Sequence, residues 1–117
     1  MKFNKITLVG ISESALGAGY WKRINSLTKK KVFLPKDSPN IRKNLGDTDC
    51  LLVAFGISVT KEDIDSTPDL KYIGVLATAY GKIDTAYAKK KKIIVSNLAG
   101  YSTESVAEFV IAAILEA

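Results

Sequence analysis

Five short apolar segments recur along the chain, and each is almost continuously hydrophobic rather than alternating with polar residues. They read ITLVG (6–10), KVFLP (31–35), CLLVAFG (50–56), YIGVLATA (72–79) and IIVSN (93–97). Strands that are buried on both faces have this pattern, because neither face is left to water. The pattern therefore predicts five strands of a parallel sheet.

Four helical segments are expected between these strands. The third begins near Thr60, because Asp63 stands three residues later, as in a capping box. The fourth lies in DTAYAKKKK (84–92). The first two are indicated by apolar residues at roughly helical spacing, which are Trp21, Ile24, Leu27, Ile41 and Leu45.

Strands that alternate with helices in this way predict an α/β fold. Right-handed crossovers then favour a flavodoxin-like, doubly wound parallel sheet of five strands in the order 2-1-3-4-5. Ligands bind such a sheet beyond the carboxyl ends of its strands. The turns after the first, third, fourth and fifth strands would meet there, at 10–14, 55–58, 78–81 and 97–101. Most of these residues are small or polar, which suits a small anion held by backbone N–H groups.

The composition fits one domain and disfavours several kinds of chemistry. The chain has 117 residues, of which 47% are hydrophobic and 25% charged, as in ordinary globular proteins. It contains no histidine and a single cysteine, Cys50, so we expect no metal site. A lone cysteine forms no internal disulfide, which favours a cytoplasmic location. No apolar run is long enough to cross a membrane, and no membrane partner is expected.

The net charge of +5 raises the question of nucleic acid binding. Much of the excess lies in two lysine clusters, 29–31 and 89–92, each expected near the end of a helix and just before a strand. Cations at that position interact favourably with the helix dipole. Neither cluster is interleaved with aromatic residues in the way that single-strand binding requires. We therefore expect no nucleic acid partner.

Three ligand-binding motifs fit the sequence poorly. Gly17 and Gly19 could begin a dinucleotide fingerprint, but the strand ends too early and Lys22 occupies the third glycine position. A receiver-type phosphoacceptor would follow the third strand, whereas Asp47 and Asp49 precede it and are expected at the opposite edge. The serines of GISESALGAG match a flavodoxin-type phosphate loop only weakly.

The stretch YSTESVAEFVIAAILEA (101–117) predicts a helix that is apolar on nearly all sides. Ser102 or Thr103 can serve as its N-cap, and the run from Phe109 to Leu115 has no wholly polar face. A helix of this kind is normally covered on both sides. We expect residues 102–116 to pack against a further domain or a second copy of the chain.

Residues 70–116, LKYIGVLATAYGKIDTAYAKKKKIIVSNLAGYSTESVAEFVIAAILE, resemble the N-terminal substrate domain of the D-isomer-specific 2-hydroxyacid dehydrogenases. The similarity is greatest to the glycerate dehydrogenase, or hydroxypyruvate reductase, branch. Its most specific parts are SVAE at the start of the apolar helix and the preceding Asn-x-x-Gly-Tyr. The resemblance implies a flavodoxin-like substrate domain over 1–100. It also implies that the helix over 101–117 connects to a Rossmann NAD domain and packs in a dimer.

The resemblance also implies where a substrate would bind. The loop after the third strand would offer backbone N–H groups to a substrate carboxylate, and the turn after the fourth strand would line the cleft. The residues implied in these two roles are Phe55, Gly56, Ile57, Thr78 and Tyr80.

Two further residues, Thr103 and Val106, would approach the cofactor, although a helix cap and a core position are the alternatives for them. The chain departs from the family after the fourth strand, where Ala77, Ala79 and Gly81 stand in place of the usual glycines and aspartate. The family's G-x-G-x-x-G motif, arginine, glutamate and catalytic histidine would all lie beyond residue 117. No catalytic residue is therefore expected within this chain.

We therefore expect the substrate-binding part of an NAD- or NADP-dependent D-2-hydroxyacid dehydrogenase, which reduces a small 2-oxo acid in its full-length form. Without histidine the chain lacks the usual proton donor, so we expect it to be truncated, inert alone and without bound cofactor. Two alternatives stay open. One is a stand-alone module that binds a small anion, and the other is an interaction protein that dimerises through 102–116.

Overall fold

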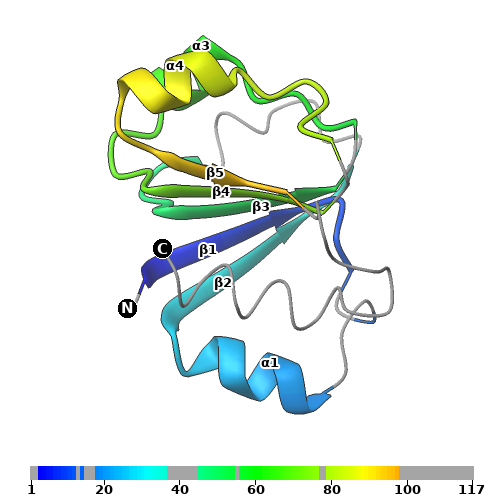
Figure 1. Ribbon diagram of the computed structural model, residues 1–117. Coiled ribbons are helices and arrows are strands. Elements are labelled where there is room, and N and C mark those ends of the chain that lie inside the picture. The colour runs from blue at the N-terminus through cyan, green and yellow to red at the C-terminus, as the bar shows by residue number, and fades with distance from the viewer. Residues whose placement is uncertain are drawn as a thin grey trace.

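The computed structural model describes residues 3–12, 14, 18–36, 45–54, 56–76 and 79–97. Its strands form one sheet in the order β2-β1-β3-β4-β5, and every neighbouring pair is parallel (Figure 1). The predicted fold class and strand order are thus confirmed. The strands are β1 (Phe3–Val9), β2 (Thr28–Leu34), β3 (Cys50–Ala54), β4 (Tyr72–Leu76) and β5 (Ile94–Ser96).

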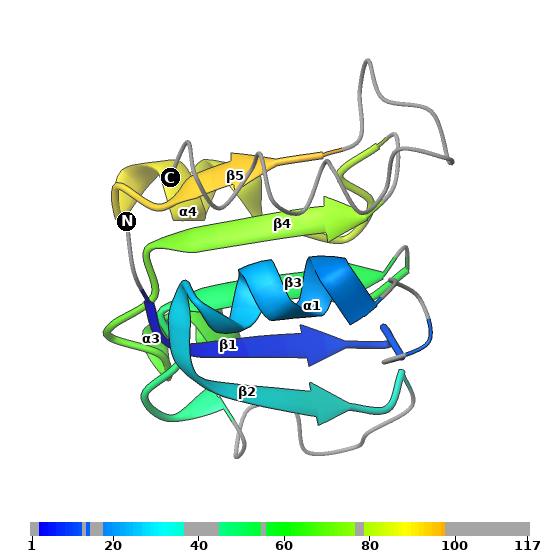
Figure 2. The ribbon, with the colours of Figure 1, turned by 90° about the horizontal axis from the view of Figure 1, so that it is seen from below.

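Helices lie on both faces of this sheet. α1 (Ala18–Asn25) covers one face, while α3 (Lys61–Asp65) and α4 (Thr85–Lys90) cover the other (Figures 1 and 2). Of the second predicted helix only Leu45 is described, and it is buried. The predicted terminal helix over 102–116 lies outside the described residues.

The apolar side chains form two clusters, one on each face of the sheet, because successive residues of a strand point to opposite faces. This arrangement explains why the central strands β3 and β4 are hydrophobic without interruption. The cluster on the α1 side contains Phe3, Ile6, Leu8, Trp21, Ile24, Cys50, Leu52 and Tyr72. The cluster on the α3 and α4 side includes Val9, Leu51, Val53, Ile64, Leu70, Ile73, Val75, Ala88 and Ile93.

Both α3 and α4 begin at residues whose side chains cap the helix. Thr60 caps α3 in a capping box, because its hydroxyl accepts the Asp63 N–H and the Asp63 carboxylate accepts the Thr60 N–H. Asp84 caps α4 by accepting the Tyr87 N–H at 3.0 Å. The predicted third and fourth helices are confirmed, and Lys89 and Lys90 occupy the last turn of α4 as expected.

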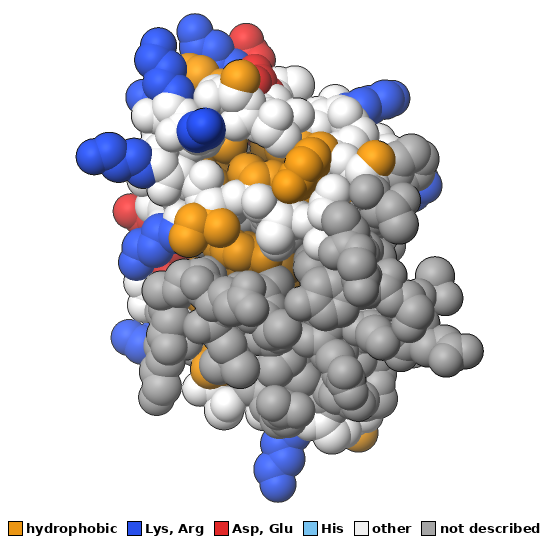
Figure 3. Space-filling model, viewed as in Figure 1, with side chains coloured by type: hydrophobic (Ala, Val, Ile, Leu, Met, Phe, Trp, Pro, Cys, Tyr) orange, Lys and Arg blue, Asp and Glu red, His pale blue; other side chains and the backbone are white. Residues whose placement is uncertain are grey.

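The prediction for the other lysine cluster, 29–31, is wrong. These residues lie inside β2, because α1 already ends at Asn25 and the strand begins at Thr28. β2 is an edge strand of the described sheet, and charged residues on an edge oppose pairing with other chains. Lys31 also packs its amine over the Trp21 ring, 4.6 Å from the centroid. On the face shown in Figure 3, basic side chains gather over α4 and are otherwise scattered.

The acidic residues before β3 lie at the amino edge of the sheet, as predicted. Asp49 is buried, and its two carboxylate oxygens accept the backbone N–H groups of Asn4 at 2.8 Å and Lys5 at 3.0 Å. Asp47 is exposed and forms a salt bridge with the Lys5 amine at 3.3 Å. A hydrogen bond from Lys5 lowers the pKa of Asp47. Asp49 therefore has a structural role, in which it fixes the start of β1.

Cys50 provides a direct measure of how well this core excludes solvent. Its side chain is fully buried, and burial raises the pKa of the thiol. Because alkylation needs an exposed thiolate, we expect iodoacetamide to modify the native chain at least about 100-fold more slowly than the urea-unfolded chain. Mass spectrometry of timed aliquots measures both rates. Equal rates would show that the cluster around Cys50 is open to solvent.

Candidate functional site

The candidate site lies at the carboxyl edge of the sheet, where the chain leaves every strand in the same direction (Figure 2). β1 ends at Val9 and is followed by Gly10, whose φ of +73° suits a residue without a side chain. A Cβ atom at this position would lie 3.1 Å from the Cβ of Ala54, at the end of β3. The glycine therefore allows β1 and β3 to end side by side, at the point where the strand order reverses.

The turns after β3 and β4 are joined to each other. The Val59 N–H donates to the Lys82 carbonyl at 3.2 Å, and the Asp84 N–H donates to the Val59 carbonyl at 2.9 Å. This isolated bridge pairs Val59 with Ile83, and both side chains are buried. We call residues 56–60 and 80–84 the paired loops. Their cross-links hold two segments of the edge in a fixed relation.

Sequence reasoning did not find this bridge. Its signal is weak, since Val59 and Ile83 are single apolar residues within polar loops and no repeat marks them as strand positions. Both become buried because the loops fold over the α3 and α4 side of the sheet. The bridge matters for the site because it places the two loops that carry the predicted substrate residues next to each other.

The predicted substrate residues that the structure describes all lie on the paired loops. Gly56 is exposed with φ +88°, and none of the hydrogen bonds among the described residues uses its N–H group. Ile57 is 5% exposed, and its N–H makes a long 3.4 Å hydrogen bond to the Ala54 carbonyl. Tyr80 is 40% exposed on the second loop. The structure thus brings Gly56 and Tyr80 to one edge, where the Gly56 N–H has no hydrogen-bond partner among the described residues.

Four of the predicted residues cannot be placed. Phe55, Thr78, Thr103 and Val106 lie outside the described residues. In the sequence, Phe55 directly follows the last residue of β3, and Thr78 stands two residues after the last residue of β4.

A hollow of about 370 Å³ adjoins the ends of β1 and β2 at this same edge. Gly10, Ile11 and Phe33 line it, and Ser12 and Lys36 add polar groups. The volume is near the lower end for small-molecule pockets. Sequence reasoning missed Phe33, near the end of β2, and Lys36, just after it, because this strand was not expected to contribute to the ligand edge.

The chemistry of this edge suits binding rather than catalysis. It offers the exposed lysines 36 and 82 and the backbone N–H of Gly56, which has no hydrogen-bond partner within the described part of the chain. All of these attract an anion. Asp84, the acidic side chain on the paired loops, is already used as the cap of α4. Within the described ranges, no group of three or more His, Cys, Asp or Glu side chains is arranged to hold a metal ion.

The membrane criterion can be checked for the same part of the chain. No helix among the described residues has the length and apolar character needed to cross a bilayer.

Comparison with known proteins relates this chain to a single protein family. The family model of the D-isomer specific 2-hydroxyacid dehydrogenase catalytic domain matches residues 14–113. A hydroxypyruvate reductase from Blautia hydrogenotrophica is 32% identical over 99 residues, which are 82% of this chain and 30% of that protein. The chain thus spans about a third or less of the length of the relatives it matches.

Solved structures agree with this assignment. An acyclic imino acid reductase in complex with NADPH and D-arginine superposes with a TM-score of 0.68 at 35% identity, covering 92% of this chain and 35% of that one. A D-lactate dehydrogenase from Aquifex aeolicus, complexed with NAD and lactic acid, also gives a TM-score of 0.68, at 27% identity over 94% of this chain and 32% of that one. The chain therefore belongs to the D-isomer specific 2-hydroxyacid dehydrogenase family, and its residues 14–113 correspond to part of the catalytic domain.

Proposed function

We propose that this chain forms the substrate-binding domain of an NAD- or NADP-dependent 2-hydroxyacid dehydrogenase that reduces a small 2-oxo acid. The observation that carries the proposal is the exposed Gly56 turn on the paired loops, whose N–H has no acceptor among the described residues. Membership of the family and the substrates named for its relatives support the substrate class.

The substrate carboxylate would be held by backbone N–H groups of the first paired loop. Gly56 can donate without losing a bond to any described residue, whereas Ile57 would give up a long contact to the Ala54 carbonyl. Phe55 and Thr78 would complete the two walls from the adjoining turns. Tyr80, with a large exposed ring, would cover the bound acid. The arrangement uses fixed main-chain dipoles, which cost no reorganisation when an anion arrives.

The remaining parts of the reaction would come from outside this chain. A bound nicotinamide cofactor would supply the hydride for the carbonyl carbon, and a proton would have to reach the carbonyl oxygen. The chain contains no histidine to supply that proton. We propose that a Rossmann domain binds the cofactor, that Thr103 and Val106 lie at its edge, and that residues 102–116 pack against that domain or a second copy.

The domain division follows from the same proposal. Residues 1–100 would form the substrate domain and 101–117 the connection to the cofactor domain. The hydride donor and the 2-oxo acid would then meet between the two domains, with the paired loops on the substrate side. In this division the described chain binds the substrate but does not reduce it, and an activity assay can test this.

An NADH oxidation assay tests that separation. We expect the purified 117-residue chain to oxidise no NADH in the presence of glyoxylate or hydroxypyruvate, because it carries neither a histidine nor a glycine-rich dinucleotide loop after its first strand. A full-length hydroxypyruvate reductase serves as the positive control under the same conditions. Turnover that scales with the concentration of the chain and survives repurification would contradict the proposed division.

A further inference from the structure

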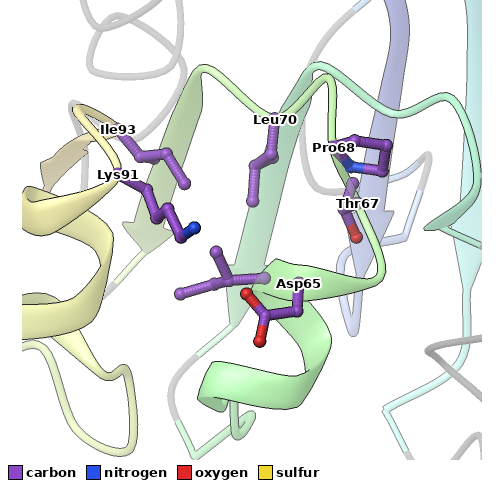
Figure 4. Close-up of a pocket in the computed structure, with 7 residues that line it drawn as sticks. Asp65, Thr67, Pro68, Leu70, Lys91 and Ile93 are labelled. Carbon is purple, nitrogen blue, oxygen red and sulfur yellow. The ribbon is translucent and has the colours of Figure 1, made fainter.

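A second hollow, of about 260 Å³, lies at the amino ends of β4 and β5, on the opposite edge of the sheet from the paired loops. The end of α3, the turn before β4 and the turn before β5 form its walls (Figure 4). This volume admits a small organic molecule and is too small for a dinucleotide. The hollow takes no part in the site described above.

The base of this hollow is apolar. Ile64, Leu70 and Ile93 line it, and all three are buried members of the cluster on the α3 and α4 side. The Thr67 hydroxyl, which also lies there, donates to the Asp63 carbonyl at 2.8 Å and is therefore already used as a donor. A ligand would meet hydrocarbon at the base rather than hydrogen-bonding groups.

Two opposite charges stand at the rim. Asp65 comes from the end of α3 and Lys91 from the turn after α4, and Figure 4 shows the carboxylate and the amine pointing into the same hollow. Both side chains are exposed. Among the described residues the salt bridge that forms is the one between Lys5 and Asp47, so Asp65 and Lys91 do not neutralise each other.

Tyr87 on α4 holds both charges in place. Its hydroxyl donates a hydrogen bond to Asp65, and this bond raises the pKa of Tyr87. The amine of Lys91 lies 5.5 Å from the centroid of the same ring, within the range of a cation–π interaction. One aromatic residue thus contacts both the carboxylate and the ammonium at the mouth of an apolar hollow.

We propose that this hollow binds a small zwitterion with an apolar side chain, of the chemical class of the free aliphatic α-amino acids. The ligand ammonium would lie against Asp65 and the ligand carboxylate against Lys91. The aliphatic side chain would cover Leu70 and Ile93. This inference goes beyond the proposed function and does not depend on it, because the two sites lie at opposite edges of the sheet.

Amide chemical shifts of the isotope-labelled chain, followed during addition of L-leucine, test the proposal. We expect saturable shifts at Thr67, Leu70 and Ile93, with a dissociation constant on the order of 1 mM, because exposed charge pairs bind weakly. Three analogues remove one feature each. They are 4-methylpentanoate without the ammonium, 3-methylbutylamine without the carboxylate, and glycine without the side chain. Each should bind at least about fivefold more weakly.

Two pairs of variants show whether the rim charges are responsible. Asp65→Asn and Lys91→Gln should each weaken leucine binding at least about fivefold. Asp69→Asn and Lys90→Gln remove an exposed charge of the same sign nearby, outside the lining of the hollow, and should leave binding unchanged. The proposal is overturned if leucine gives no saturable shift at these amides, or if all four variants bind leucine as the original chain does.

Discussion

Replacing Asp49 by asparagine is expected to lower the free energy of unfolding by about 2–4 kcal/mol, the cost of disrupting buried hydrogen bonds to a charged group. The carboxylate is 1% exposed and accepts two backbone N–H groups at once, from Asn4 and Lys5. Asparagine has one acceptor oxygen, so its NH₂ group would face a backbone N–H. One buried donor would lose its partner.

The position of Asp49 increases this effect. Its own N–H donates to the Lys5 carbonyl at 3.2 Å, and its carbonyl accepts the N–H groups of Lys71 and Tyr72 at 2.9 and 3.3 Å. One residue therefore connects the starts of β1, β3 and β4. Urea unfolding followed by circular dichroism measures the change. Asp47→Asn is the control, because Asp47 is 70% exposed and should alter stability far less. Equal losses in the two variants would refute this role of Asp49.

Gly74→Ala is expected to destabilise the chain by about 1–3 kcal/mol, although alanine normally suits a strand better than glycine. Gly74 lies in the middle of β4. A Cβ atom there would come within 2.7 Å of the Leu52 Cδ2 atom and 3.1 Å of the Tyr72 Cε1 atom. Both neighbours are fully buried, and the Tyr72 hydroxyl is hydrogen-bonded to Ser96, so neither moves freely.

The matched substitution Gly19→Ala should have the opposite effect on stability and raise the free energy of unfolding. Gly19 lies within α1, and a Cβ atom at that position would meet no atom of the described residues within 4 Å. Alanine there should stabilise the chain by about 0.5–1 kcal/mol through its helix propensity. The same urea experiment measures both variants. If Gly74→Ala also proved stabilising, the packing between β3 and β4 would be looser than the structure shows.

Much of the fold could be predicted because buried strands and helix caps have strong local signals. The uninterrupted apolar runs indicated strands covered on both faces, and helices were found on both faces. The pair Thr60 and Asp63 marked the start of α3 from the sequence alone. In these cases the residues that determine the element lie within a few positions of one another.

The lysines at 29–31 show where such local signals fail. A run of lysines suggested the end of a helix, yet the residues belong to β2. They are tolerated there because an edge strand needs to bury less of its surface than a central one. Whether a strand lies at the edge depends on the order of the whole sheet, which a local window does not contain.

The candidate site was predictable at the level of the edge but not in its detail. Parallel topology alone placed Gly56 and Tyr80 at the carboxyl ends of the strands. The bridge between Val59 and Ile83, which fixes the two loops against each other, joins residues distant in sequence and carries no motif. The partial use of the Ile57 N–H by Ala54 likewise appears only in three dimensions.

The most direct test of the central claim is an amide shift map of the labelled chain during addition of glyoxylate, with sodium chloride at matched ionic strength as the control. If the paired loops bind the carboxylate of a small 2-oxo acid, the largest saturable shifts will fall on Gly56, Ile57 and Tyr80. Thr67 and Ile93, at the opposite edge, will stay unchanged. Shifts that are absent from the paired loops, or no larger there than with sodium chloride, would contradict the assignment of this edge as the substrate site.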